Sequence, residues 1–190
     1  MSENLLSLPG LSVLAVNTND SHLENKHASI PGLRLSGKGV NEVRKFGIQA
    51  AGTPVWAEHF MDCVGSIVVA QKATLMTHHF GDYLVERMGI FQAIGDLQRE
   101  VYQVDGGVAV IWRKAFTDRA EDKSYKEAAK MWYQMLAKLY LDNTIAVYDM
   151  VFRDWEWPLS AYYDGHRTLN LVANVNDYEK LIQPEITQLK

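Results

Sequence analysis

Hydrophobic and polar residues form their clearest pattern in the middle of the chain, where two β-rich runs follow each other. The first run spans Val64–Gln71 and the second Thr74–Phe80, and Lys72-Ala73 between them is predicted to be a turn. Both runs are short, rich in apolar and β-branched residues and bounded by polar ones, which is typical of strands. The pattern therefore predicts a β-hairpin over residues 64–80.

Two later segments repeat apolar residues every three or four positions, which is the spacing of one helix face. The first predicted helix runs from Tyr83 to Val101. The second runs from Glu121 to Leu141, behind a capping box that Glu121 forms with Asp118. The apolar stripe of the second helix consists of Tyr125, Ala128, Ala129, Trp132, Met135, Leu136 and Leu139.

Strands and loops are predicted on either side of these elements. The polar stretch 17–29 is interpreted as a loop, residues 1–30 are expected to be partly disordered, and a short helix is expected around Asn41–Phe46. Further strands are predicted at 11–17, 108–114, 144–152 and 168–175. This order of elements predicts one α+β domain over residues 1–190, built as a layered sandwich with mostly antiparallel strands.

Composition narrows the class of protein. Hydrophobic residues make up 47% of the chain and charged residues 22%, as in ordinary globular domains. The net charge of -4 and the scattered basic residues argue against a nucleic-acid-binding protein, because phosphate recognition requires a basic surface. No window approaches the ~18 apolar residues of a membrane-spanning helix, and the N-terminal residues lack a signal-peptide pattern. A cytoplasmic protein, or one delivered into a host cell without a cleavable signal peptide, is expected.

Candidate chemistry lies at the predicted hairpin. Cys63, the one cysteine in the sequence, immediately precedes the hairpin, and His78 and His79 lie near the end of its second strand. A cysteine becomes a useful nucleophile when a neighbouring base or positive charge favours its thiolate. Successive side chains of a strand point to opposite faces, so only one of the two histidines can meet Cys63. The pattern thus predicts a Cys–His pair at the open end of the hairpin, with purely structural roles as the alternative.

The residues around this pair resemble a known family. Cys63-Val-Gly-Ser-Ile-Val-Val-Ala-Gln-Lys72, followed by Thr77-His-His-Phe-Gly81, resembles the catalytic segment of the cytotoxic necrotizing factors. These toxins are grouped with the bacterial chemoreceptor deamidase and the Burkholderia lethal factor as cysteine hydrolases. In that group a Cys leads into a strand and a His lies on the next strand, and Cys63 and His78 show the interval of the necrotizing factors. The resemblance implies a layered α/β/β/α sandwich and a bacterial toxin or effector that converts a glutamine of a target protein to glutamate.

The resemblance also implies roles for single residues. Cys63 would attack the amide carbon, backbone N–H groups near Asp62 and Cys63 would hold the oxyanion, and His78 would act as acid and base. The imidazole needs an acceptor on its other ring nitrogen, for which Asp62 and Thr77 are candidates, and His79 is the alternative base. This hydrolysis requires no cofactor and no metal, and its partner is a protein substrate.

Two other interpretations stay open. Four residues are possible zinc ligands: His59, Cys63, His78 and His79. His59 and Cys63 would share a face if residues 56–63 were helical. Alternatively, the aromatic residues Trp155 and Trp157 would form the binding surface of a non-catalytic, protein-binding effector or adaptor.

Overall fold

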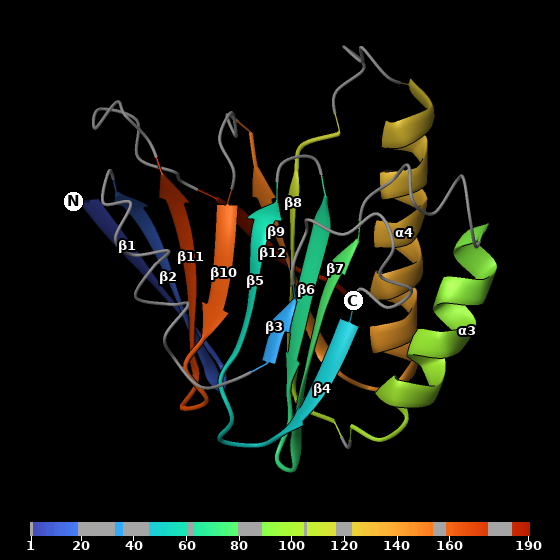
Figure 1. Ribbon diagram of the computed structural model, residues 1–190, viewed down its shortest axis with the longest axis horizontal. Helices are drawn as coiled ribbons and strands as arrows, with labels where there is room; N and C mark the ends of the chain where they lie inside the picture. Colours follow the sequence, from blue (N-terminus) through green and yellow to red (C-terminus); the bar gives the residue numbers. More distant parts are fainter. Residues whose placement is uncertain are drawn as a thin grey trace.

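Two β-sheets pack face to face, and two helices lie along the outer side of one of them (Figure 1). The computed structural model describes residues 2–18, 33–35, 46–60, 63–79, 89–104, 106–116, 123–153, 159–174 and 184–190. Across these residues strands predominate over helices, and the α+β class expected from the sequence is confirmed.

The first sheet joins segments from distant parts of the chain. Its strands lie in the order β1 (Ser2–Leu8), β2 (Leu11–Thr18), β11 (Thr168–Asn174), β10 (Leu159–Tyr163), β5 (Val55–Phe60) and β3 (Leu33–Leu35). The neighbours β2–β11 and β5–β3 are parallel, and the others are antiparallel. Gly10, in the turn between β1 and β2, has a φ of 84°, a conformation that glycine adopts without strain.

The second sheet carries the predicted hairpin. Its order is β12 (Glu185–Gln188), β9 (Ala146–Phe152), β8 (Val108–Lys114), β6 (Val64–Val69), β7 (Ala73–His79) and β4 (Phe46–Ala50). Among its neighbours β8–β9 is parallel and the rest are antiparallel. The central strands β6 and β8 are covered on both faces, which explains why their sequences are nearly continuous apolar runs.

Both described helices cover the second sheet. α3 (Gly89–Val101) and α4 (Lys123–Asp142) pack on its outer face (Figure 1). The stripe predicted for the second helix is largely buried, since Ala128, Ala129, Trp132, Leu136 and Leu139 are all in the core. Neither helix is long and apolar enough to cross a membrane.

Two apolar cores result from this layering. One lies between the two sheets and includes Ile67, Trp112 and Phe60. The other lies between the second sheet and the helices and includes Val68 and Trp132. Strand β6 contributes to both cores because its successive side chains point to opposite faces. The two cores therefore meet at the strands that carry the candidate site.

Several strands lie where the pattern predicts none, namely β1, β3, β4, β5, β10 and β12. β1 falls within the N-terminal stretch expected to be partly disordered, and most of the predicted loop 17–29 lies outside the described residues. Phe46 begins β4 instead of ending the expected short helix, whose remaining residues also lie outside them. The start of the first predicted helix, before Gly89, and the Asp118–Glu121 capping box are likewise outside them.

Candidate active site

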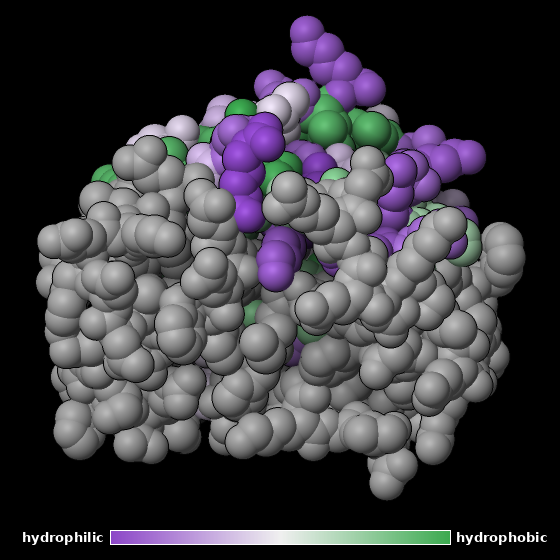
Figure 2. Space-filling model, turned by 90° about the horizontal axis from the view of Figure 1, so that it is seen from above, coloured by the Kyte–Doolittle hydropathy of each residue, from purple (hydrophilic) through white to green (hydrophobic). Residues whose placement is uncertain are grey.

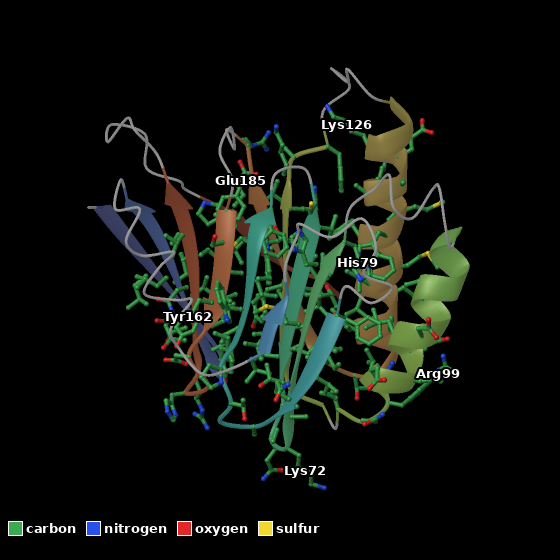
Figure 3. The ribbon with its side chains drawn as sticks, viewed as in Figure 1. Lys72, His79, Arg99, Lys126, Tyr162 and Glu185 are labelled. Carbon is green, nitrogen blue, oxygen red and sulfur yellow. The ribbon has the colours of Figure 1, made fainter. Side chains whose placement is uncertain are left out.

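The loop of the β6–β7 hairpin lies one residue earlier than the sequence predicts. The Ala70 N–H donates to the Ala73 carbonyl oxygen at 3.0 Å, so Gln71 and Lys72 form a two-residue loop. Lys72 marks this loop at the lower end of the sheet (Figure 3). Moving a loop by one residue moves each pairing partner by two, and side chains alternate with a period of two. Each side chain therefore keeps the face that the predicted turn gave it.

His78 and His79 point to opposite faces of the second sheet. Gly65 of β6 pairs with His78. The His78 ring stacks on Phe60 of β5, with the two ring centroids 3.8 Å apart, so it faces the other sheet. The His79 ring has its centroid 3.9 Å from that of Trp132 in α4, so it faces the helices (Figure 3).

Cys63 belongs to the same side of the sheet as His78. It precedes Gly65, the partner of His78, by two residues, and it packs in the core between the sheets with Phe60 and Trp112. Diagonal neighbours on adjacent strands have Cα atoms ~7–8 Å apart, so a thiol and an imidazole placed in this way can meet. The thiol-bearing residue is 1% exposed and His78 is fully buried. The structure thus brings the two predicted residues to one face and one end of the hairpin.

Gly65 allows a tryptophan to pack directly against the backbone beside this pair. A Cβ atom at this position would lie 2.2 Å from Cε2 of Trp112, a distance that real atoms do not tolerate. Trp112 in turn meets Phe60 edge to face, with the ring centroids 5.3 Å apart. Phe60 of the facing sheet therefore contacts both the His78 ring and Trp112.

Thr77 lies on the helix side of the sheet. Its hydroxyl oxygen is 2.7 Å from Oγ of Ser66, and Ser66 Oγ is 2.6 Å from the hydroxyl of Tyr140 in α4. This buried chain of hydroxyls links α4 to the sheet. The Thr77 side chain is separated from the His78 ring by the sheet itself, so it does not orient that imidazole as the sequence analysis considered.

The zinc interpretation loses its geometric basis. Residues 55–60 form strand β5, whereas that interpretation required a helix over 56–63. His78 and His79 face opposite sides of the sheet, so one ion cannot bind both. Among the described residues, no group of three or more His, Cys, Asp and Glu side chains is placed to hold a metal. The side chain of His59 is outside this description.

Three candidates from the sequence lie outside the described residues. Asp62 is one of them, and Trp155 and Trp157, which carry the adaptor interpretation, are the others. The structure therefore places Cys63 and His78 on the face toward the other sheet. It places His79 and Thr77 on the face toward the helices.

A small pocket borders Cys63 where β6 begins and β8 ends. It is lined by Cys63, Val64, Arg113, Lys114, Ala115, Phe116, Lys126 and Ala129. Its volume is about 20 Å³, which is room for one group the size of a water molecule. Lys126 lies at the upper end of α4 (Figure 3), and viewed from this end the described residues display mainly hydrophilic side chains (Figure 2). Among the residues that the structure describes, the lining brings three cationic side chains to Cys63.

Arg113 is held rigidly in the wall of this pocket. Its guanidinium donates two hydrogen bonds to the Asp149 carboxylate, at 3.1 and 2.8 Å, and lies 4.6 Å from the ring centroid of Phe116 and 4.3 Å from that of Tyr133. The Tyr133 hydroxyl donates to the same carboxylate at 2.9 Å. Burial, and then the negative charge of Asp149, raise the pKa of Tyr133. The charge of Arg113 is therefore balanced within the protein.

The sequence pattern does not predict this basic wall, which Arg113, Lys114 and Lys126 form. Its one signal was Asp149, a charged residue within the otherwise apolar strand β9, because a buried carboxylate requires a partner. Arg113 and Lys114 follow the apolar run of β8 and resemble an ordinary solvent-exposed strand end. Lys126 reaches the pocket only through the packing of α4, which the sequence pattern does not specify.

The chain matches no protein-family model and no curated protein sequence. The resemblance to the necrotizing factors therefore depends on the short segments that begin at Cys63 and Thr77, together with the arrangement that the hairpin gives them.

Proposed function

We propose that this protein is a cysteine amidohydrolase that converts a glutamine side chain of a target protein to glutamate and releases ammonia. The observation that carries the proposal is the shared position of Cys63 and His78 on the inner face of the β6–β7 hairpin, at its open end. A thiol and an imidazole at adjacent positions are the two groups that such a hydrolysis requires. The resemblance of the surrounding segment supports the same chemistry.

In the proposed reaction the Cys63 sulfur attacks the carboxamide carbon as a thiolate while His78 carries a proton. The C–N bond breaks as His78 gives this proton to the departing ammonia, which leaves a thioester on Cys63. A water molecule then gives a proton to His78, and the resulting hydroxide attacks the thioester carbon. Cleavage of the C–S bond restores the thiolate and the protonated His78 and releases the glutamate side chain. Backbone N–H groups at Asp62 and Cys63 are the proposed donors to the oxyanion.

The finer features implied by the resemblance belong to the same proposal. They are an α/β/β/α sandwich, a role as a bacterial toxin or effector, and action inside a cell. The β/β/α part of that sandwich is supported by two facing sheets with both described helices over one of them. Apart from the water that it consumes, the reaction needs only the target protein.

The experiment is incubation of the purified protein with a cell lysate, followed by mass spectrometry for glutamine-to-glutamate conversion and an assay of released ammonia. Wild-type protein should convert one or a few target proteins. Cys63→Ser keeps the size of the side chain but replaces the sulfur with a poor nucleophile, so conversion should fall by a factor of at least about 10³. His78→Gln should lose conversion to a similar extent because the acid and base are removed.

His79→Gln is the matched control, because it makes the same change at the adjacent position on the opposite face. It should retain conversion in a protein whose circular dichroism spectrum is that of the wild type. Wild-type conversion by a folded Cys63→Ser protein would refute the proposal, and so would the absence of any conversion by the wild type under conditions where it stays folded.

A further inference from the structure

The first sheet ends at β1, and this edge differs from the other sheet edges that the structure describes. Among the described strands β1 pairs with β2 alone, and it lies at one margin of the sheet (Figure 1). At the other side of the sandwich the edge strands β3 and β4 contact each other. β12 is short and carries Glu185, whose carboxylate accepts hydrogen bonds from Arg153. β1 is seven residues long, and positions 4–8 contain no charged residue and no proline. Short strands, charges and prolines usually protect a sheet edge from another chain, so β1 is open to pairing.

Alternate residues of β1 direct their backbone groups away from β2. Leu8 and Leu11 close a two-residue loop, and the pair that closes such a loop is hydrogen-bonded. Hydrogen-bonded and non-hydrogen-bonded pairs alternate along an antiparallel ladder, so positions 3, 5 and 7 belong to the second kind. Ser12 is the partner of position 7, and its N–H donates to the Arg167 carbonyl oxygen on the far side of β2, at 2.8 Å. The N–H and C=O groups of positions 3, 5 and 7 therefore point outward from the edge of the sheet.

An apolar side chain lies exposed at the centre of this edge. Leu6 and Leu8 pack against the core between the sheets, so Leu5 lies on the outer face of the first sheet. Leu5 is 62% exposed. A single exposed leucine is ordinary on a protein surface. This one lies midway between two other positions whose backbone groups point outward, in a stretch of strand without charge.

A second copy of the chain fits this edge about a two-fold axis. If two antiparallel copies of β1 continue one sheet with the same faces, the axis is perpendicular to the sheet and passes through a residue. An axis at position 5 pairs Leu5 with Leu5 of the second copy, and it pairs position 3 with position 7. Each of these pairs can exchange two hydrogen bonds, and the two exposed leucine side chains meet on the outer face. An axis at position 4 or 6 would pair position 7 with 1, or position 3 with 9, and positions 1 and 9 lie outside β1.

We propose that this protein forms a two-fold symmetric dimer by antiparallel pairing of β1 with β1 of a second copy, with Leu5 on the axis. The first sheet then continues from one subunit into the other, and its open edge is closed. The proposal goes beyond the function proposed for Cys63 and does not depend on it, because Cys63 lies beside β6 in the second sheet. One pair of short strands forms a small interface, so we expect a dissociation constant of about 1–100 μM.

The test is sedimentation velocity of the full chain at concentrations from about 1 μM to 1 mM, which span the expected dissociation constant. Wild-type protein should change from monomer to dimer as its concentration rises. Leu5→Lys and Leu5→Glu each place like charges opposite each other on the axis, so each variant alone should dimerise at least about tenfold more weakly. An equimolar mixture of the two variants should restore association, because a residue on a two-fold axis meets its own copy and the mixture pairs Lys with Glu.

Met131→Lys is the matched control. It makes the same change at a 43% exposed position of α4, a helix that covers the other sheet, and it should associate like the wild type. The Leu5 variants should keep the circular dichroism spectrum of the wild type, since the side chain that they replace is exposed. The proposal is overturned if the wild type stays monomeric throughout the concentration range, or if Leu5→Lys associates as tightly as the wild type. Failure of the mixture to restore association would also overturn it, because Leu5 would then not lie on the axis.

Discussion

At the scale of single residues, the contact between Gly65 and Trp112 shows how closely the candidate site is packed. At position 65 of β6 the indole of Trp112 occupies the space that a Cβ atom would fill. Trp112 is itself fully buried and contacts Phe60, so it has little room to move. The identity of this one residue is therefore set by its neighbour on β8 and not by its own strand propensity.

Gly65→Ala should destabilise the protein by about 1–3 kcal/mol, the usual cost of overpacking a rigid core. The measurement is the free energy of unfolding in a chemical denaturant. Gly95→Ala is the control, because Gly95 lies in α3 with no atom within 4 Å of an added Cβ, and alanine should stabilise that helix by up to about 1 kcal/mol. A Gly65→Ala protein as stable as the wild type would show that the indole is more mobile than its burial suggests.

At the scale of elements, α4 is fixed to the second sheet by a polar contact within an apolar interface. The Tyr140 hydroxyl forms a hydrogen bond with the Ser66 hydroxyl, which forms another with the Thr77 hydroxyl, and all three side chains are buried. Burial raises the pKa of Tyr140, and the hydrogen bonds to Ser66 and Thr77 lower it by less. The neutral hydroxyl is therefore the form that the folded protein accommodates.

Tyr140→Phe should lower the free energy of unfolding by about 1 kcal/mol at neutral pH, through loss of the hydrogen bond. Because the folded-state pKa is raised, Tyr140 adds no pH dependence below the pKa of an unfolded tyrosine, ~10. Above that pH the unfolded chain ionises first and stability falls, so the decline should be shallower in Tyr140→Phe than in the wild type. Denaturation curves at a series of alkaline pH values provide the measurement. Tyr102→Phe, at a site that is 69% exposed, should follow the wild-type curve.

The elements that the sequence predicted are those whose pattern reflects burial. The strands β6 and β8 are central in their sheet, and the helix α4 is amphipathic. The spacing of their apolar residues therefore indicates which side chains are buried in the two cores. The edge and short strands, such as β1 and β12, have few buried positions, so neighbours rather than local pattern decide their conformation. The candidate pair was predictable because an error of one residue in the turn preserves the face of every side chain. The basic wall of the pocket was not predictable from the sequence, since it depends on which strand and helix ends lie next to each other in the fold.

At the scale of the whole molecule, the two cores share the strands of the second sheet. Trp112 reports on the core between the sheets, and Trp132 reports on the core beneath the helices. Since alternate residues of β6 belong to one core or the other, neither core can be lost while the other stays intact. This arrangement supports the expectation of one domain over the chain.

Unfolding by a denaturant should therefore follow a single transition, with tryptophan fluorescence and far-ultraviolet circular dichroism giving the same midpoint. The sequence contains five tryptophans, so Trp112→Phe and Trp132→Phe are each compared with the wild type, and the signal lost in each variant is that of one core. A difference between the two midpoints that exceeds the difference in overall stability between the variants would indicate that the cores unfold independently. The chain would then contain two cooperative units.

The parallel pairing of β2 with β11 has a consequence for synthesis on the ribosome. The hairpin of β1 and β2 is made first, but its partner ends only at Asn174. Likewise, β5 is synthesised before its antiparallel neighbour β10, and β9 is synthesised before its antiparallel neighbour β12. The nascent chain must therefore keep several strand edges open until these distant partner strands have been synthesised, and such edges readily pair with other chains. Ribosome-associated chaperones, or a slow rate of folding set by these distant pairings, would then govern the yield of native protein.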